Sequence, residues 1–221
     1  EVVGLVGGSG TGKSVLMRTI VGLNAARAGT IEVLGVRTAG LRADAERQLQ
    51  RRWGVLFQDG ALFSSLTVAE NIAVALREHA ELDDATIRRI AALKVALVGL
   101  PPEAADKKPS ELSGGMRKRA GLARALALDP ELLFVDEPTA ELDPIGAALF
   151  DELIRRLQQS LGLTVLMVTH DLDSLGAICD RIAVLLDKRI VAGTMAELLA
   201  FDHPWVRDYF HGPRGRAARQ E

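Results

Sequence analysis

The chain has 221 residues, of which 48% are hydrophobic, and this length and composition suit one folded domain rather than a disordered chain. Its 27 basic residues are nearly balanced by 29 acidic ones, giving a formal net charge of −2, so no overall basic field indicates a nucleic-acid-binding protein. A single cysteine excludes an intramolecular disulfide, and no apolar run approaches the roughly 18 to 20 residues that span a bilayer.

Apolar runs of strand length predict a parallel sheet with both faces covered, because these runs are continuous and do not alternate with polar residues. They are VVGLV near the start of the chain, LLFVD at 132–136, TVLMVTH at 164–170 and IAVLLD at 182–187. Segments of helical period separate them, so the expected fold class is α/β. Beyond them, IAVLLDKRIVAG predicts a hairpin at the sheet edge and TMAELLA a short helix, while 212–221 is expected to be a flexible basic tail.

The stretch GGSGTGKS, Gly7 to Ser14, matches the phosphate-binding pattern G-x-x-x-x-G-K-[ST] and lies between the first apolar run and the helical run VLMRTIVGL. Its glycines allow backbone N–H groups to wrap phosphates, Lys13 offers a charge to the β and γ oxygens, and Ser14 can ligate Mg²⁺. The alternative is a glycine turn that contains a lysine by chance. The residues expected to hold a nucleotide here are Gly7, Gly8, Ser9, Gly10, Thr11, Gly12, Lys13, Ser14 and Val15.

A long, mostly helical insert separates the first strand from LLFVD, and roughly 67–128 is expected to form a helical subdomain. Thr67-Val-Ala-Glu70 is a capping box that opens a helix toward Arg77, and either Asp83 or Asp84 can cap a second helix. The apolar face of that second helix ends before a glycine and a Pro-Pro stop.

Within this insert, the stretch ELSGGMRKRA places Ser113, Gly114 and Gly115 directly ahead of a predicted helix. The two glycines expose backbone N–H groups, and a helix start carries partial positive charge, so this segment can bind an anion. The alternative is a plain capped helix with Ser113 as its N-cap. The segment alone does not decide between these two interpretations.

Polar residues also follow three apolar segments, LLFV, GVLF and VLMVT. Asp136 and Glu137 close the run LLFV, and beside a P-loop they are candidates for a Mg²⁺ ligand and a general base for water, respectively. Gln58 follows GVLF and His170 follows VLMVT, which places both at strand ends, where ligands bind in open parallel sheets. Taken singly, Asp136 and Glu137 are also consistent with a surface acid pair, and Gln58 and His170 are more typical of a surface amide and a structural histidine. Their joint presence at strand ends favours the functional interpretation.

Together these motifs, in this order, resemble those of the ABC ATPases over nearly the whole chain. The resemblance implies a P-loop NTPase (RecA-like) core with an inserted helical subdomain, one cassette spanning 1–221. Gly7–Ser14 is similar to Walker A, Gln58 to the Q-loop, Leu112–Met116 to the signature, LLFVDE to Walker B, AELD at 140–143 to the D-loop and His170 to the switch histidine.

The same resemblance implies the site and its cofactors, ATP and Mg²⁺. The catalytic residues would be Glu137, His170 and Gln58, and the metal ligands Ser14, Gln58 and Asp136. Two cassettes pair head to tail in that family, so each chain would form a homodimer. The residues that would then contact nucleotide beyond the P-loop are Ser113, Gly114, Gly115 and Asp143, the signature residues acting on ATP held by the partner.

Met116 stands where most ABC signatures have glutamine, and methionine cannot supply the amide hydrogen bond. The segment LSGGM, with LFQDGALFSSLTVAENIAVALREH and HPWVRDYFHGPRGRA, resembles the ATPases of bacterial MCE/Mla-type phospholipid transporters. Drift at a tolerant position is the alternative. This branch implies a membrane permease, a periplasmic MCE lipid carrier, a small STAS-domain subunit, and a peripheral place on the cytoplasmic face of the inner membrane. The permease would contact Gln58–Asn71 through the apolar side chains Phe57, Leu62, Phe63 and Leu66.

Other classes of function fit less well. A soluble ABC ATPase acting on nucleic acid or ribosomes typically carries two fused cassettes or a long coiled coil, and this sequence has neither, so no nucleic-acid partner is expected. A small G protein needs an N-K-x-D guanine motif, which does not occur. An ABC ATPase that serves a transporter of another small molecule remains the alternative function.

The start of the chain differs from the family pattern. Cassettes of this family begin with antiparallel strands and an aromatic residue that stacks on adenine. Here Glu1 already opens the strand before the P-loop, so we expect the sequence to be a fragment.

Overall fold

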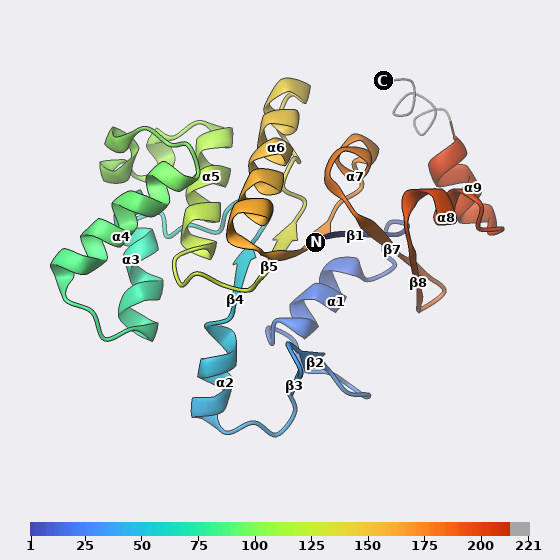
Figure 1. Ribbon diagram of the computed structural model, residues 1–221, viewed down its shortest axis with the longest axis horizontal. Coiled ribbons are helices and arrows are strands. Elements are labelled where there is room, and N and C mark those ends of the chain that lie inside the picture. The colour runs from blue at the N-terminus through green and yellow to red at the C-terminus, as the bar shows by residue number, and fades with distance from the viewer. Residues whose placement is uncertain (213–221) are drawn as a thin grey trace. The chain divides into compact units, whose positions relative to one another are not determined.

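The computed structural model describes residues 1–212 and forms an α/β fold built on a mostly parallel sheet, which confirms the predicted fold class (Figure 1). The chain divides into two compact units, Glu1–Ser14 with the chain from Val135 onward, and Val15–Phe134. The strand order of the main sheet is β4-β5-β6-β1-β7-β8. The division falls inside β5 (Leu132–Asp136), between Phe134 and Val135.

The first unit holds the central strand of this sheet. β1 (Val2–Val6) pairs in parallel with β6 (Thr164–Val168), in the register Val3↔Leu166, and with β7 (Arg181–Leu186), in the register Val3↔Arg181. Four of the five residues of β1 are buried, as the continuous apolar run predicts. Because β1 is flanked on both sides, the loop after it leaves the sheet at the carboxyl ends of its neighbours, where α/β proteins place ligands.

Helices and a hairpin complete the first unit. β7 pairs antiparallel with β8 (Arg189–Gly193), which confirms the predicted edge hairpin. The helices are α6 (Pro144–Leu161), α7 (Leu172–Ile178), α8 (Met195–Leu199) and α9 (Pro204–His211), and α8 packs on the hairpin and on α9 (Figure 1, orange to red). The predicted tail at 212–221 lies, from residue 213 onward, outside the described residues.

The second unit is mostly helical. Its elements are α1 (Lys13–Ile20, which begins in the first unit), β2 (Glu32–Val33), β3 (Val36–Arg37), α2 (Ala43–Gln50), β4 (Trp53–Leu56), α3 (Val68–His79), α4 (Asp84–Leu97), the 3₁₀ helices η1 (Pro102–Asp106) and η2 (Pro109–Glu111), and α5 (Gly114–Ala125). The helices α3, α4 and α5 pack against one another (Figure 1, green). The predicted capping box on α3 is present, with Thr67 and Glu70 bonded in both directions, and of the two candidate caps on α4 it is Asp83 that accepts from the Thr86 amide.

The two short strands β2 and β3 form a separate antiparallel ladder that the apolar pattern does not indicate. Each has only two residues, and alternation cannot be recognised over so short a length. None of the helices in residues 1–212 is both long and apolar enough to cross a membrane.

Candidate nucleotide site

The P-loop (Gly7–Ser14) follows β1 directly, and α1 begins at Lys13, so the strand–loop–helix context that the motif requires is present. The Lys13 ammonium donates to the carbonyl oxygens of Gly7 at 2.9 Å and Gly8 at 3.2 Å. The Thr11 hydroxyl also donates to the Gly8 carbonyl, at 2.9 Å. The lysine is therefore folded over its own loop, with its charge at the centre of the turn.

Two glycines give this loop its shape. Gly10 and Gly12 have φ values of 76° and 100°, a left-handed conformation that side chains rarely adopt. A Cβ atom at either position would meet nothing within 4 Å, so the space above the loop is open. Backbone amides, an ammonium and the Ser14 hydroxyl around an open concave loop are a donor set that fits a polyphosphate with its divalent cation.

Asp136 and Glu137 follow at the end of β5, and the backbone turns between them. Asp136 is buried, whereas Glu137 adopts φ 46°, which is strained for a residue with a side chain. The Glu137 amide donates to the Val168 carbonyl at 2.8 Å, which ties this turn to the end of β6. The left-handed backbone at Glu137 ends the extended conformation of β5 directly after Asp136.

Glu137 and His170 form a close pair. The carboxylate Oε2 of Glu137 lies 2.7 Å from Nδ1 of His170, although the two residues are far apart in sequence. Their side chains are 18% and 72% exposed, so the carboxylate is sheltered while most of the imidazole faces solvent. A carboxylate held by an imidazole at the carboxyl end of a sheet can accept a proton from water, and its partner can orient a bound group.

Asp143 lies in the same unit at the start of α6. Its Oδ1 accepts from the Gly146 amide at 2.9 Å, which makes it the N-cap, with Pro144 at the first helical position. Asp143 is exposed, so its other carboxylate oxygen is available at the surface.

The second unit carries Val15, Gln58 and the signature residues. Ser113 is the N-cap of α5, its hydroxyl accepting from the Met116 amide at 3.3 Å, so the capped-helix interpretation is correct. Ser113 and Gly114 are exposed, which leaves the anion-binding interpretation open alongside it. Because Met116 donates its backbone amide to the cap, its side chain is not needed for this turn.

The sequence reasoning missed two cations that join the signature helix to the Gln58 loop. Lys118 donates to the Gln58 carbonyl at 2.8 Å, and Arg124 donates to the Gly60 carbonyl at 3.1 Å. Burial lowers the pKa of Arg124. A Cβ atom on Gly121 would lie 2.8 Å from the Gly60 Cα, so helix and loop touch backbone to backbone. In the sequence, Lys118 and Arg124 flank the buried residues Ala120, Leu122 and Ala123, and this position alone does not indicate either contact.

The first unit therefore contains the P-loop, Asp136, Glu137, Asp143 and His170, and within it Glu137 and His170 are in direct contact. Over residues 1–212 no three His, Cys, Asp or Glu side chains are grouped so as to hold a metal ion. Mg²⁺ commonly binds one or two protein carboxylates together with substrate phosphates and water, so a set as small as Ser14 and Asp136 fits this ion.

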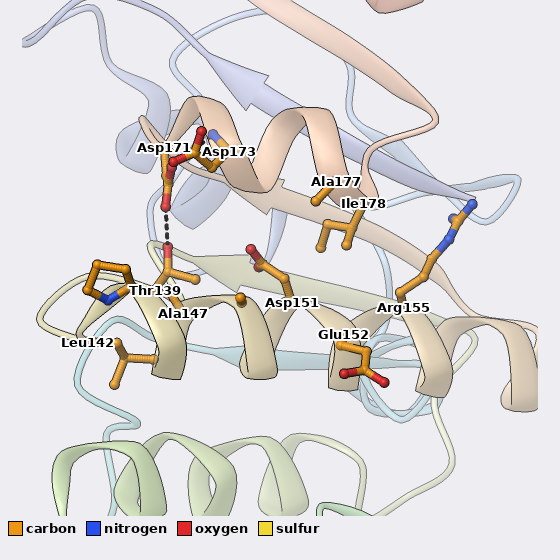
Figure 2. A pocket seen from close by; sticks show the side chains of 12 residues that line it. Thr139, Leu142, Ala147, Asp151, Glu152, Arg155, Asp171, Asp173, Ala177 and Ile178 are labelled. Carbon is orange, nitrogen blue, oxygen red and sulfur yellow. Dashed lines mark hydrogen bonds between the residues drawn. The ribbon is translucent and has the colours of Figure 1, made fainter. Parts of the chain in front are cut away.

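A pocket of about 600 Å³ lies between α6 and α7 in the first unit (Figure 2). Asp151 of α6 points into it, and its Oδ2 accepts from the Ser174 hydroxyl of α7 at 2.6 Å. Thr139 donates to Asp171 at 3.4 Å across the other end of the pocket. Burial raises the pKa of Asp151 to about 6, and the charges of Asp171 and Asp173 add to that shift.

The raised pKa of Asp151 predicts that the free energy of unfolding depends on pH. The folded pKa of Asp151, about 6, exceeds its ordinary value of 3.8, so between these values the folded chain binds more protons and the free energy of unfolding falls as pH rises. Asp151→Asn is expected to be more stable than the wild type above pH 6 by about 1–3 kcal/mol, and equal to it near pH 4. Urea denaturation across this range, with Glu152→Gln as the control, measures the difference. A loss of stability that is the same at all pH values would show that the Ser174 bond dominates instead.

The strand–loop–helix, its lysine and the acidic turn at the end of β5 define a P-loop nucleotide-binding protein. A model of the ABC transporter family matches residues 1–140, more than half of the chain. The chain therefore belongs to the ABC transporter family, as the motif order predicted.

Relatives of known name extend this comparison. The chain is 42% identical over 216 residues to the "Probable ribonucleotide transport ATP-binding protein mkl" of Mycobacterium tuberculosis (strain ATCC 25618 / H37Rv), covering 97% of the chain and 60% of that relative. It is 39% identical over 213 residues to the "Intermembrane phospholipid transport system ATP-binding protein MlaF" of Escherichia coli (strain K12), covering 96% of the chain and 79% of the relative. The chain thus spans about three fifths of the mycobacterial protein's length.

Among solved structures, the chain resembles the dimeric post-hydrolysis state of the ATP-binding cassette MJ0796 bound to ADP and Pi. The TM-score is 0.79 at 30% identity, and the match covers 88% of this chain and 85% of the other. The predicted resemblance to ABC cassettes, and within them to the Mla-type ATPases, is thereby confirmed.

Proposed function

We propose that this chain is the ATP-hydrolysing subunit of a transporter that moves phospholipid between the inner and outer membranes of a bacterium. The observation that carries the ATPase part is the Glu137–His170 pair, at 2.7 Å, in the same compact unit as the P-loop. The relative named MlaF, which matches 96% of this chain, supports the phospholipid part. The Glu137–His170 pair bears only on ATP hydrolysis, whereas the MlaF relative bears only on the cargo.

In this proposal, the P-loop amides and Lys13 hold the β and γ phosphates of ATP, and Ser14, Asp136 and Gln58 hold Mg²⁺. The ion, when bound, neutralises charge on the phosphate oxygens. Glu137 accepts a proton from the water that attacks the γ-phosphorus, and His170 orients the γ-phosphate. The strained turn at Glu137 supports this assignment, because strained backbone is commonly retained where a side chain must be aimed.

A second copy of the chain completes each site. Its Ser113, Gly114 and Gly115 contact the γ-phosphate from the other side, where the amino end of the twelve-residue helix α5 supplies partial positive charge. Asp143 lies beside this interface. The exposure of Ser113 and Gly114 supports this assignment, as does the dimeric state of the matching solved cassette.

The permease contact is assigned to the Gln58–Asn71 loop. Asn71 is buried and holds the loop, its side chain accepting from the Phe63 amide at 2.7 Å and donating to the Thr67 carbonyl at 2.9 Å. Phe63 is 52% exposed on this ordered loop, which suits an apolar contact with a membrane protein. The chain then lies on the cytoplasmic face of the inner membrane, with an MCE lipid carrier and a STAS-domain subunit as further partners of the complex.

A different small-molecule transporter is the second candidate. The relative named mkl is described as a ribonucleotide transporter, and a relative in Ralstonia nicotianae, 41% identical over 191 residues, as a methionine importer. The cassette holds no cargo site in this proposal, so its own residues do not separate the candidates.

Co-purification separates them. We expect the full-length protein, isolated from membranes of its own bacterium in mild detergent, to carry with it a permease and an MCE-type lipid carrier identified by mass spectrometry. Phe63→Ser should reduce this recovery severalfold while ATP hydrolysis by the isolated cassette stays unchanged, and exposed Leu93→Ser on α4 is the matched control. Recovery of a permease without a lipid carrier would contradict the phospholipid assignment and leave the ATPase assignment intact.

A further inference from the structure

We infer that Trp205 and Tyr209 of α9 are positioning residues that hold the P-loop and the His170 segment in their working arrangement. This inference rests on the proposed ATPase function, which it deepens by adding a support for the nucleotide site from the last described helix. Both residues lie in the same compact unit as the two segments they contact.

The helix α9 is anchored through a different face. Val206 and Phe210, four residues apart, are 0% and 1% exposed and belong to one buried cluster with Val6, the last residue of β1, and with Val184 of β7. Because the anchor includes the strand end that leads into the P-loop, α9 is held at a fixed position next to that loop.

Trp205 and Tyr209 are also four residues apart, one position back along the helix, so they share the neighbouring face. Their rings are stacked, with centroids 4.6 Å apart and planes 15° from parallel. Stacked aromatic pairs are stabilised beyond the area that they bury, so each ring favours the observed position of the other. Both residues also pack against the buried cluster.

The indole of Trp205 lies against Gly8. A Cβ atom built on Gly8 would be 3.2 Å from the indole Nε1, which is tighter than ordinary contact. The Gly8 carbonyl is also one of the two that receive the Lys13 ammonium, at 3.2 Å, and it accepts from the Thr11 hydroxyl. Trp205 therefore covers the residue around which the loop's own hydrogen bonds converge.

Tyr209 contacts the other segment. Its hydroxyl donates to the His170 carbonyl at 3.1 Å. Burial, together with the negative charges of Glu137 and Asp171, raises the pKa of Tyr209, so the phenol stays protonated and remains a donor at working pH. The bond fixes the backbone of the residue whose imidazole holds Glu137 at 2.7 Å.

The P-loop follows β1 and His170 follows β6, so each is set by its own strand, and the stacked pair is a third element in contact with both. Loss of either contact should then affect a different step. Weakened support of Gly8 disturbs phosphate binding, whereas weakened support of His170 disturbs the Glu137–His170 pair and hence the chemical step.

Steady-state kinetics of the purified full-length protein test this split. Tyr209→Phe keeps the ring and removes the hydroxyl, and we expect kcat to fall about three- to tenfold while KM for ATP changes less than about twofold. Trp205→Leu should raise KM for ATP about three- to tenfold with a smaller change in kcat. The control is Phe201→Leu, which changes an aromatic residue that stacks on His203 instead and should leave both constants unchanged. Thermal denaturation of each variant identifies losses that arise from unfolding.

A double-mutant cycle tests the contact directly. Gly8→Ala should weaken binding of a fluorescent ATP analogue severalfold while Trp205 is present, and should have little effect in a Trp205→Ala background, where the indole is gone. Equal effects of Gly8→Ala in both backgrounds, or parallel losses of kcat and KM in the two aromatic variants, would overturn the inference. A wild type that binds ATP but does not hydrolyse it would contradict the proposed function instead, and the binding cycle would still decide the role of Trp205.

Discussion

Replacing Glu137 with glutamine is expected to lower the ATP turnover number by about 10²- to 10⁴-fold, the usual contribution of a general base. Glutamine keeps the size of the side chain and an oxygen that can face His170, so the turn at the end of β5 should persist. The amides and the ammonium of the P-loop are untouched. ATP affinity should therefore stay within about twofold, since only the proton acceptor is lost.

The same variant should accumulate as a dimer when ATP is present, because in the proposed cycle two chains close around bound ATP and separate only after hydrolysis. Turnover is measured by phosphate release and dimerisation by size-exclusion chromatography with and without ATP. Glu152→Gln is the matched control, since Glu152 is exposed on α6 and, among the described residues, pairs only with Arg156, at 3.8 Å. Unchanged turnover in Glu137→Gln would remove Glu137 from the role of base, and lost ATP binding would assign it a structural role.

The sequence predicted the sheet well, because a strand that is buried on both faces is a continuous run of apolar residues. β1 and β5 have the limits of the runs VVGLV and LLFVD, and the P-loop lies in the expected strand–loop–helix context. The capping box at Thr67 was equally readable, because its two hydrogen bonds join residues three positions apart.

The contacts that could not be predicted join residues far apart in the chain. The local sequence around Trp205 does not indicate that its ring lies against Gly8, because that contact depends on where α9 is anchored. The 2.7 Å approach of Glu137 to His170 depends on a left-handed backbone at Glu137, a conformation that glutamate seldom adopts. Lys118 was similarly hidden, because a lysine in a helix ordinarily indicates a solvent-facing position.

The structure shows which role of position 116 does not depend on its side chain. Its backbone amide completes the Ser113 cap, at 3.3 Å, and that role belongs to the backbone of any residue except proline. The anion-binding groups proposed here are a hydroxyl and two glycine amides, and these also do not depend on the side chain at position 116. A methionine in place of glutamine therefore leaves intact the helix start that we propose contacts the partner's nucleotide.

The second large effect concerns sharing of the site between two chains. Ser113→Arg places a bulky side chain at the signature and Lys13→Ala removes the P-loop charge, so each variant alone should lose nearly all ATP turnover. A mixture of the two should regain activity, because a hybrid dimer holds one site made of an intact P-loop and an intact signature. With random assortment of subunits in equal amounts, about a quarter of all sites are intact.

A mixture of Lys13→Ala with Glu137→Gln is the control, because it shows whether mixing any two inactive variants restores activity. Both changes lie on the P-loop side of the site, so a hybrid of these two chains contains no intact site and should regain nothing. Two different affinity tags identify the hybrid dimers, and single-turnover hydrolysis measures each intact site. If hybrids of Ser113→Arg with Lys13→Ala form and still do not hydrolyse ATP, Ser113 does not act across the interface. Recovery in that mixture alone would assign the exposed helix start at Ser113 to the nucleotide bound by the other chain.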